Sequence, residues 1–113
     1  MLIDFLRHIQ QELLYIIQQT AGKELRQVLD DPTRQRALTY SLLVIGKACK
    51  NVAVDFRHEY AAFDWRRFAN LHDHLVYKYW KVDQDVFWKA ISVDVPINKE
   101  WIDIIIEQES NKL

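Results

Sequence analysis

The hydrophobic residues at the start of the chain recur at spacings of three and four. They are Leu2, Leu6, Ile9, Leu13, Ile16 and Ile17. This spacing places apolar side chains on one face of a helix, so it predicts a helix of about five turns over residues 2–20. Gly22 follows, and glycine is common just after a helix end. Leu25, Val28 and Leu29 then predict a short helical segment.

A second long stretch of helical spacing begins at residue 32. Asp31 and Pro32 form an N-cap acid followed by a proline at the first helical position. The pattern predicts a helix that runs to about Val54. Its inward positions are expected to be Ala37, Leu38, Ser41, Leu42, Ile45, Ala48 and Cys49. Gly46 lies in mid-helix, where glycine costs about 1 kcal/mol relative to alanine, so we expect another helix to approach closely there.

The second half of the chain predicts three further helices after a connection over residues 56–63. Asp64 is expected to cap a helix over residues 65–80, and Asp83 a helix over residues 84–92. Pro96 should end the latter, because proline disfavours helix in the preceding residue, and Asn98 should cap a last helix. The inward positions of the last two helices are expected to be Val86, Phe87, Ala90, Ile91, Trp101, Ile102, Ile104, Ile105 and Ile106.

These segments predict an all-α fold, a single helical bundle of five to six helices over residues 1–113. The first and third helices should pair antiparallel. Composition supports this class, because 113 residues suit one domain and two glycines with two prolines are few for a many-stranded sheet. Four tryptophans, five tyrosines and five phenylalanines give more aromatic surface than one small bundle readily buries, so we expect a homodimer.

Composition also argues against several classes of protein. The single cysteine, Cys49, cannot form an internal disulfide, and its apolar surroundings favour a buried, unreactive thiol. No apolar run reaches the roughly 18–20 residues of a membrane span, and the N-terminus lacks a signal-peptide pattern, so a cytoplasmic location is expected. No cofactor or metal motif is present, and His72 and His74 point about 200° apart on a helix, too far to share a metal.

The net charge of −1 hides a basic segment in the middle of the chain. Residues 57–81 contain five Lys/Arg against three Asp/Glu, and three of the four histidines. Residues 65–83 combine cations, imidazoles and aromatic rings, which RNA-cleaving surfaces use for phosphates, the 2′-hydroxyl proton and unstacked bases. The candidate phosphate ligands are Arg66, Arg67, Lys78 and Lys81. The alternative interpretation is a solvated helix face with ordinary aromatic core positions.

Two segments carry a resemblance to a known family. The first is Ile45-Gly46-Lys47-Ala48, similar to an Ile-Gly-Glu-Ala helix in which glutamate is usual at the lysine position. The second contains Trp65, His72-Asp73, Tyr77-x-Tyr79, Val82-Asp83 and Phe87-Trp88. In order and spacing both resemble the HepT-like branch of the HEPN superfamily, and the resemblance extends over nearly the whole chain, from about residue 2 to residue 106.

The resemblance implies a function. Members of the family it resembles are homodimeric toxins of HEPN/MNT toxin–antitoxin systems, which cleave RNA, tRNA included, without a metal. They bring two Arg-x4–6-His motifs together at the dimer cleft. Their antitoxin is a minimal nucleotidyltransferase that can AMPylate a tyrosine of the motif. In this chain the corresponding tyrosine is Tyr79.

The chain departs from the family at the positions expected to act on RNA. In the register fixed by Tyr79 and Asp83, His72 stands at the arginine position and Tyr77 at the histidine position, while Asp73 is retained. Histidine lacks the bidentate phosphate clamp of arginine. Tyrosine has a reference pKa of about 10 and is a poor general base at pH 7. This register predicts a ribonuclease with impaired activity.

A second register remains open, because Arg67-x4-His72 and Arg67-x6-His74 both satisfy the bare motif. Residues seven apart share a helix face, but this register breaks the framework of Tyr79 and Asp83. The leading hypothesis is a HepT-like toxin component with impaired catalysis. The alternative is a catalytically inactive HEPN protein that binds RNA or a nucleotidyltransferase antitoxin, and a purely structural helical adaptor is a third class.

Overall fold

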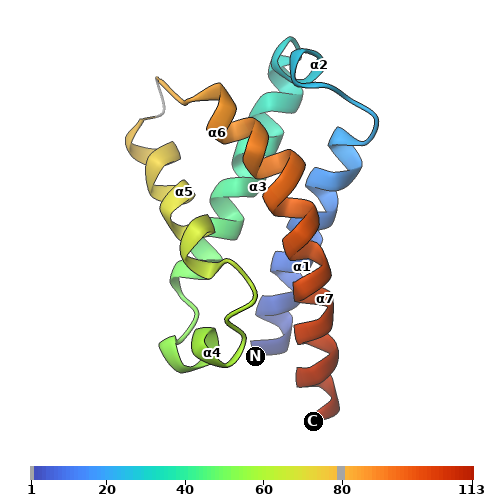
Figure 1. Cartoon of the computed structure of the whole chain (residues 1–113), viewed down its shortest axis with the longest axis vertical. Coiled ribbons are helices and arrows are strands. Elements are labelled where there is room, and N and C mark those ends of the chain that lie inside the picture. The colour runs from blue at the N-terminus through green and yellow to red at the C-terminus, as the bar shows by residue number, and fades with distance from the viewer. Residues whose placement is uncertain (1, 79–80) are drawn as a thin grey trace.

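The computed structural model describes residues 2–78 and 81–113, and this part of the chain contains helices and no strand (Figure 1). The elements are α1 (Leu2–Thr20), α2 (Leu25–Leu29), α3 (Pro32–Lys50), α4 (Val54–Glu59), α5 (Trp65–Tyr77), α6 (Gln84–Lys89), the π-helical segment η1 (Ala90–Asp94) and α7 (Val95–Asn111). Because α6, η1 and α7 follow one another without a gap, the described residues form six continuous helices. The predicted all-α fold is confirmed.

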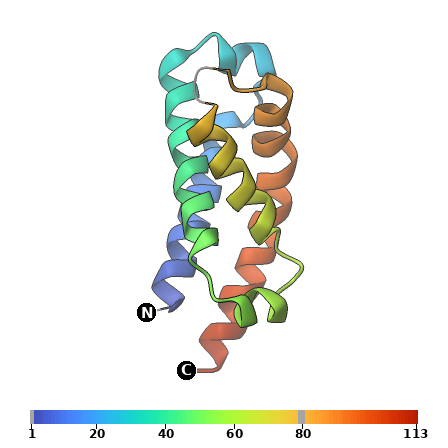
Figure 2. The same ribbon diagram turned by 90° about the vertical axis from the view of Figure 1, so that its left-hand side faces the viewer.

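The bundle is built around α1 and α3, which lie antiparallel as predicted (Figure 1). In Figure 2, α5 packs beside α3, and α7 packs along α1. The most extensive contact between two helices joins α3 to α5. The short helix α4 and both chain ends lie at one end of the bundle, whereas α2 lies at the other (Figure 1). The fold therefore places α5 beside α3.

Several helix ends follow local signals in the sequence. Gly22 has φ +70°, a left-handed conformation that glycine adopts without strain, and it terminates α1. The carboxylate of Asp31 accepts a hydrogen bond from the backbone N–H of Arg34 at the start of α3. The carboxylate of Asp83 accepts from two backbone N–H groups in the first turn of α6. The predicted caps at Asp31 and Asp83 are confirmed.

Two predicted boundaries in the middle of the chain are wrong. α3 ends at Lys50 and not near Val54, and a separate helix, α4, begins at Val54 and includes residues 56–59, where a connection was expected. The backbone N–H of Asn51 bonds to the carbonyls three and two residues earlier, which tightens and ends the last turn of α3. α5 ends at Tyr77, before the predicted residue 80. The spacing of apolar residues does not indicate where these helices end.

The predicted break over residues 93–96 is also wrong. The π-helical segment η1 joins α6 to α7, and Pro96 lies in the first turn of α7. A π turn is wider than an α turn, so it leaves room for the proline ring while the helix continues. Asn98 consequently lies inside α7 and does not cap it.

Asn98 instead joins α7 to the start of α5 from a fully buried position. Its Oδ1 accepts from the backbone N–H of Asp64 at 2.9 Å. Its Nδ2 donates to Oδ2 of Asp64 at 3.0 Å and to the carbonyl of Asp94 at 2.8 Å. The prediction that the Asp64 side chain caps α5 is therefore wrong, because its carboxylate is turned toward Asn98 and makes no capping bond to α5.

Replacing Asn98 by alanine is expected to lower the free energy of unfolding by about 3 kcal/mol, because three hydrogen bonds are lost at a buried site. Urea denaturation measures the change. Asn70 is exposed on α5 and provides the control, since Asn70→Ala should change stability by no more than about 0.5 kcal/mol. Equal effects of the two substitutions would contradict a stabilising link between α5 and α7.

The apolar faces of the helices meet in one core. Its largest fully buried side chains are Phe63, Phe68, Phe87, Leu6, Ile9, Leu13, Ile16, Leu38, Leu42, Ile45, Ile91 and Ile102. Four positions predicted to face inward are exposed: Leu2, Val86, Trp101 and Ile104. In each of these helices apolar residues occupy more than one face, so spacing alone does not identify the buried one. Cys49 is buried as predicted, and burial raises its pKa to about 12.

Candidate functional site

The candidate residues of α5 are positioned by close contact with α3 at Gly46. A Cβ atom at this position would lie 2.5 Å from the carbonyl oxygen of Phe68 and would overlap the Cβ atom of His72. Only glycine fits this approach, so the close contact predicted at Gly46 is confirmed. The contact presses His72 against α3 and leaves 17% of its side chain exposed.

His72 is hydrogen-bonded to the next residue in the chain. Its Nδ1 lies 3.1 Å from Oδ1 of Asp73, and Nζ of Lys50 donates to the same oxygen at 2.7 Å. Because an ionised carboxylate only accepts hydrogen bonds, Nδ1 of His72 is the donor in this pair. The hydrogen bond from Lys50, and then that from His72, hold the pKa of Asp73 below its usual value. Asp73 thus orients an imidazole that could transfer protons.

Removal of the Lys50 ammonium, as in Lys50→Met, is expected to raise the pKa of Asp73 toward its usual value. A lowered folded-state pKa stabilises the fold above the unfolded-state pKa of about 3.9, and this stabilisation is lost as the pH falls through the folded-state value. The variant should therefore lose less stability on acidification below about pH 4. Carboxyl NMR titration of Asp73 measures the shift. Lys47→Met, one turn earlier on α3, should leave that pKa unchanged.

His72 also borders a shallow groove of about 380 Å³ between α1, α3 and α5. His8 of α1 lines this groove together with Lys47 of α3 and Asn51, the residue after the end of α3. His8 was not predicted from the sequence, because its position on the polar face of α1 does not reveal which helix lies beside that face. Two imidazoles and an ammonium around one groove are groups that could contact a phosphate and exchange protons with it.

The structure separates His72 and Tyr77, the two residues predicted to stand at substituted motif positions, within one chain. His72 packs against α3, whereas Tyr77, in the last turn of α5, is 71% exposed. Residues five apart point about 140° away from each other on a helix. The two side chains therefore do not form one site on a single copy of α5. Tyr79, the tyrosine predicted to be modified, lies outside the described residues.

The residues of the second register are engaged elsewhere. Nη1 of Arg67 donates to Oδ1 of Asp94 at 3.0 Å, and Nζ of Lys89 lies 3.7 Å from the same oxygen. Asp94 is buried in η1, so Arg67 ties α5 to the π-helical segment. His74 is half-buried, and its Nε2 has no hydrogen-bond partner among the described residues. The ion pair gives Arg67 a structural role.

The other candidate phosphate ligands lie at opposite ends of α5. Arg66 is exposed in the first turn, and Lys78 is exposed directly after the last turn. Lys81 follows, and its backbone N–H donates to the carbonyl of Lys78 at 2.8 Å. The basic residues of the segment therefore form two groups, one at each end of the helix.

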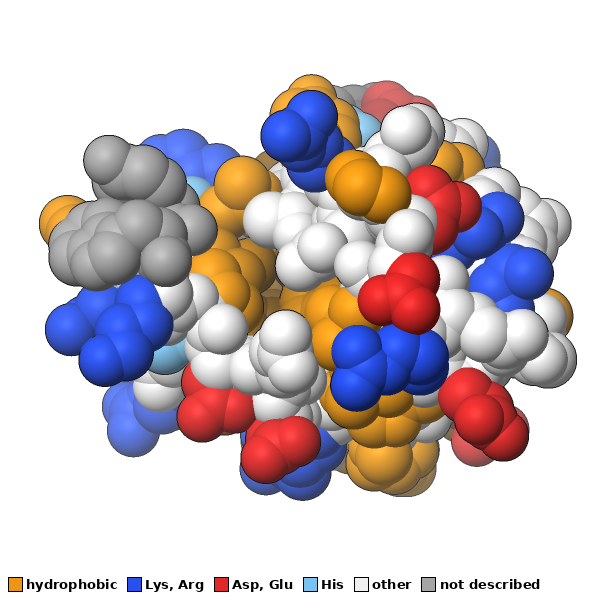
Figure 3. Space-filling model, turned by 90° about the horizontal axis from the view of Figure 1, so that it is seen from above, with side chains coloured by type: hydrophobic (Ala, Val, Ile, Leu, Met, Phe, Trp, Pro, Cys, Tyr) orange, Lys and Arg blue, Asp and Glu red, His pale blue; other side chains and the backbone are white. Residues whose placement is uncertain are grey.

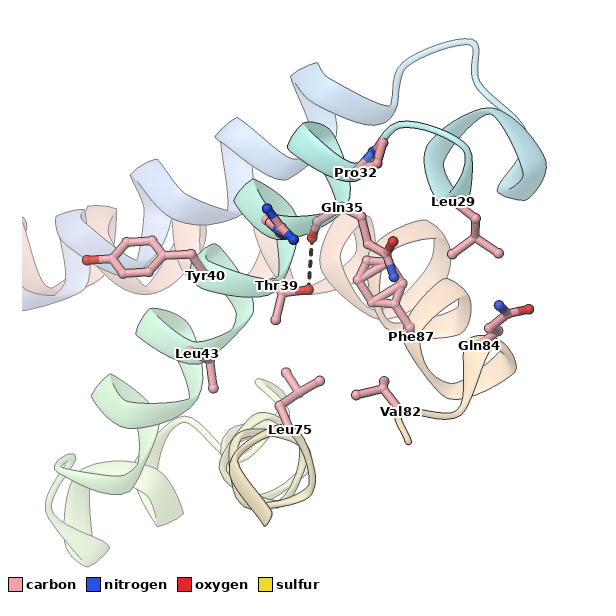
Figure 4. Close-up of a pocket in the computed structure, with 11 residues that line it drawn as sticks. Leu29, Pro32, Gln35, Thr39, Tyr40, Leu43, Leu75, Val82, Gln84 and Phe87 are labelled. Carbon is pink, nitrogen blue, oxygen red and sulfur yellow. Dashed lines mark hydrogen bonds between the residues drawn. The ribbon is translucent and has the colours of Figure 1, made fainter. Parts of the chain in front are cut away.

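A hollow of about 540 Å³ lies between α3, the C-terminal part of α5 and α6. Figure 4 shows Leu43, Leu75, Val82 and Phe87 around its apolar interior, with the amide of Gln84 at the edge. Figure 3 looks down on this end of the molecule and shows apolar side chains at the base of a recess. Such a hollow, apolar inside with a few polar groups around it, has the size and character of a small-ligand site.

Two further observations concern metal-binding groups and membrane-spanning helices. In residues 2–78 and 81–113, no group of three or more His, Cys, Asp or Glu side chains is arranged to hold a metal ion. Among the helices of the described chain, none combines the length and apolar character needed to span a membrane.

Comparison with known proteins gives a consistent result. A family model described as "Ribonuclease HepT-like" matches residues 9–105. A candidate RNase of Caldanaerobacter subterraneus is 30% identical over 105 residues, which cover 93% of this chain and 94% of that protein. A "probable ribonuclease HepT" of Thermococcus cleftensis is 32% identical over 93 residues, 82% of this chain and 84% of that protein. No solved structure matches the chain at a significant level.

Proposed function

Because the chain belongs to the HepT-like ribonuclease family, we propose that it acts on RNA as the toxin component of a HEPN/MNT toxin–antitoxin system. Its own metal-independent cleavage is impaired, because His72 and Tyr77 replace the arginine and histidine of the motif. The observation that carries the proposal is the family match over residues 9–105, which includes all of α5 and its contact with α3.

The arrangement of α5 favours the register that contains His72 and Tyr77. In the competing register the arginine would be Arg67, and the guanidinium of Arg67 is already paired with the buried carboxylate of Asp94. His72 lies instead beside a groove that an RNA backbone could enter. An exposed phenol stands at position 77 in place of an imidazole, the side chain that most often serves as general base, and this replacement is the physical reason for expecting slow cleavage.

A homodimer would complete the site. His72 and Tyr77 point to different sides of one helix, so a second copy of α5 is needed to place residues of both kinds around one substrate. Exposed apolar side chains support association, among them Tyr40, Tyr77, Ile97 and Trp101. Sedimentation equilibrium should give the mass of a dimer. A monomer mass at all protein concentrations would contradict this part of the proposal.

The proposed partner is a minimal nucleotidyltransferase antitoxin that AMPylates Tyr79. Incubation with such an enzyme and ATP should add AMP to the peptide that contains Tyr79, as mass spectrometry would show. Tyr79→Phe should remove the modification, whereas Tyr40→Phe, at an exposed tyrosine on α3, should leave it unchanged. Modification at other tyrosines alone would contradict the assignment of Tyr79.

The second candidate is a catalytically inactive HEPN protein that binds RNA or the nucleotidyltransferase, and the same two substitutions favour it. Incubation of the purified chain with RNA in EDTA tests both candidates. Slow cleavage supports the impaired ribonuclease, and RNA binding without cleavage supports the inactive binder. If neither the parent nor a variant with the family's motif restored cleaves or binds RNA, this result would contradict an action on RNA.

A further inference from the structure

A cationic hollow lies between α4 and the first turn of α5, away from the groove at His72. Its volume is about 380 Å³. Four basic side chains line it: Arg57 and His58 from α4, and Arg66 and Arg67 from α5. Asp64 is the carboxylate among the lining residues, and its Oδ2 is bonded to Asn98. The hollow therefore brings together basic groups of the segment 57–81 that belong to two different helices.

Arg57 has a donor that the described protein leaves unused. Its Nε atom is buried and has no hydrogen-bond partner in the described chain. Buried donors are almost always paired, so an orphan in a native fold calls for an explanation. Arg57 also lies near enough to Cys49 for its charge to lower the pKa of that thiol, in opposition to the larger effect of burial. The Nε end of the guanidinium is thus held against the protein.

The start of α5 adds further donors. The first backbone N–H groups of a helix have no partner within the helix, and a side chain commonly caps them. In α5 the N-cap residue is Asp64, and its carboxylate is directed to Asn98 and makes no capping bond. The backbone N–H of Trp65 donates to the carbonyl of Phe63 at 3.0 Å and that of Phe68 to the carbonyl of Asp64 at 3.2 Å. Within the described residues the N–H groups of Arg66 and Arg67 are therefore the ones that the start of α5 can offer to an anion.

The nearby carboxylates only partly neutralise these cations. Glu59 of α4 pairs with Nζ of Lys112 at 3.3 Å, and Asp94 pairs with Arg67 at 3.0 Å. Asp55, at the start of α4, is exposed to solvent. Within the described residues no ion pair engages Arg57 or Arg66, so two guanidinium groups are available to an external anion.

An aromatic cluster holds the two helices of the hollow in fixed positions. The ring of Trp65 lies 4.3 Å from that of Phe63 and 5.9 Å from that of Phe56, centroid to centroid. Nε1 of Trp65 donates to the carbonyl of Tyr60 at 3.0 Å, which fastens α5 to the end of α4. A rigid arrangement of this kind lowers the entropy cost of binding, because the ligand does not need to order the site.

We propose that this hollow is a phosphate-binding subsite that holds one phosphodiester of single-stranded RNA. The planar guanidinium of Arg57 fits phosphate oxygens in a bidentate manner, and Arg66 and the first-turn N–H groups of α5 contact the same group. The inference rests on the proposed action on RNA and adds a binding position at the opposite end of α5 from Tyr77. The subsite strengthens binding of the strand irrespective of its sequence.

The salt dependence of RNA binding tests the subsite. Anisotropy of a labelled single-stranded RNA, measured over a range of salt concentrations, gives the slope of log affinity against log salt. Arg57→Gln and Arg66→Gln should each weaken binding roughly tenfold at low salt and reduce the magnitude of the slope by about 0.7. Arg26→Gln removes one positive charge from exposed α2, at the other end of the bundle, and should leave the slope unchanged. Equal slopes for all four proteins would overturn the proposal.

A direct measurement separates the subsite from the wider proposed function. The NMR signal of the Arg57 Nε–H group should shift when inorganic phosphate is added and should shift further with RNA. If phosphate shifts the Arg57 signal but the parent chain does not bind RNA, this result would contradict both the proposed action on RNA and the assignment of RNA as the ligand of the hollow. RNA binding without any shift at Arg57 would overturn the subsite and leave the proposed function standing. Should Arg57→Gln fail to fold by circular dichroism, exposed Arg66→Gln provides the affinity test.

Discussion

The variant His72→Arg/Tyr77→His is expected to cleave RNA about a hundredfold faster than the parent chain, or more. An arginine at position 72 can clamp a phosphate with two parallel hydrogen bonds. A histidine at position 77 titrates near neutral pH and can accept the 2′-hydroxyl proton, and general acid–base catalysis typically contributes about 10²- to 10⁴-fold. Cleavage of a labelled RNA in the presence of EDTA measures the rate.

Matched variants show whether position 77 is responsible for the gain. His72→Arg/Tyr40→His introduces the same two side chains but places the histidine at an exposed tyrosine of α3, so it should not reach the rate of the restored motif. Each single substitution should recover less than the pair, because residues of one catalytic unit act together. Arg67→Ala separates the registers, and it should reduce stability through the loss of the Asp94 pair without removing restored activity.

Two results would contradict this register. If the parent chain cleaves RNA and loses that activity on Arg67→Ala while remaining folded, Arg67 belongs to the active motif. If the parent cleaves RNA and the double variant is slower, the imidazole of His72, oriented by Asp73, acts as the general base in its own right.

The Gly46→Ala variant is expected to be less stable than the parent by about 2 kcal/mol. The added methyl group would meet the carbonyl oxygen of Phe68 and the Cβ atom of His72, and overpacking of this kind costs about 3 kcal/mol. The better helix propensity of alanine returns about 1 kcal/mol. For a domain of this size the midpoint of thermal unfolding should fall by about 8 °C.

Thermal and urea unfolding measure the effect of the methyl group, and Lys47→Ala is the control on the adjacent, exposed position of α3. The control should change stability by no more than about 0.5 kcal/mol. Stability of Gly46→Ala equal to or above that of the parent would contradict the close packing of α3 on α5. Because the same contact positions His72, the alanine variant of the restored protein should also cleave RNA more slowly.

The sequence determined the all-α class, the long helices α1 and α3, and their antiparallel pairing. It also determined the caps at Asp31 and Asp83 and the close approach at Gly46. Each of these features depends on spacing along one helix or on chemistry within a single turn. A periodicity of three and four indicates a helix with an apolar face, and a mid-helix glycine beside small residues indicates a close contact, without knowledge of the partner helix.

Only the tertiary structure decided which residues contact the start of α5. Asp64 and Asn98 both have the character of N-caps, but the packing of α7 on α5 pairs them with each other and leaves α5 uncapped. The π-helical turn likewise let the helix pass Pro96, where the sequence predicted a break. The same packing turned Arg67 toward Asp94. Such choices depend on residues about 30 positions apart, whose relative placement local propensity does not encode.

The candidate site, too, was predicted in part from the sequence, and the rest was decided by the fold. Sequence alone identified α5 as the segment of interest and predicted, in the register of Tyr79 and Asp83, that His72 and Tyr77 depart from the family's motif. The fold brought His8 to the groove of His72, and Arg57 to the hollow beside Arg66. These residues are separated along the chain and belong to different helices, so no spacing rule joins them. Helix packing sets their proximity, because it is the burial of the apolar faces that decides which polar faces become neighbours.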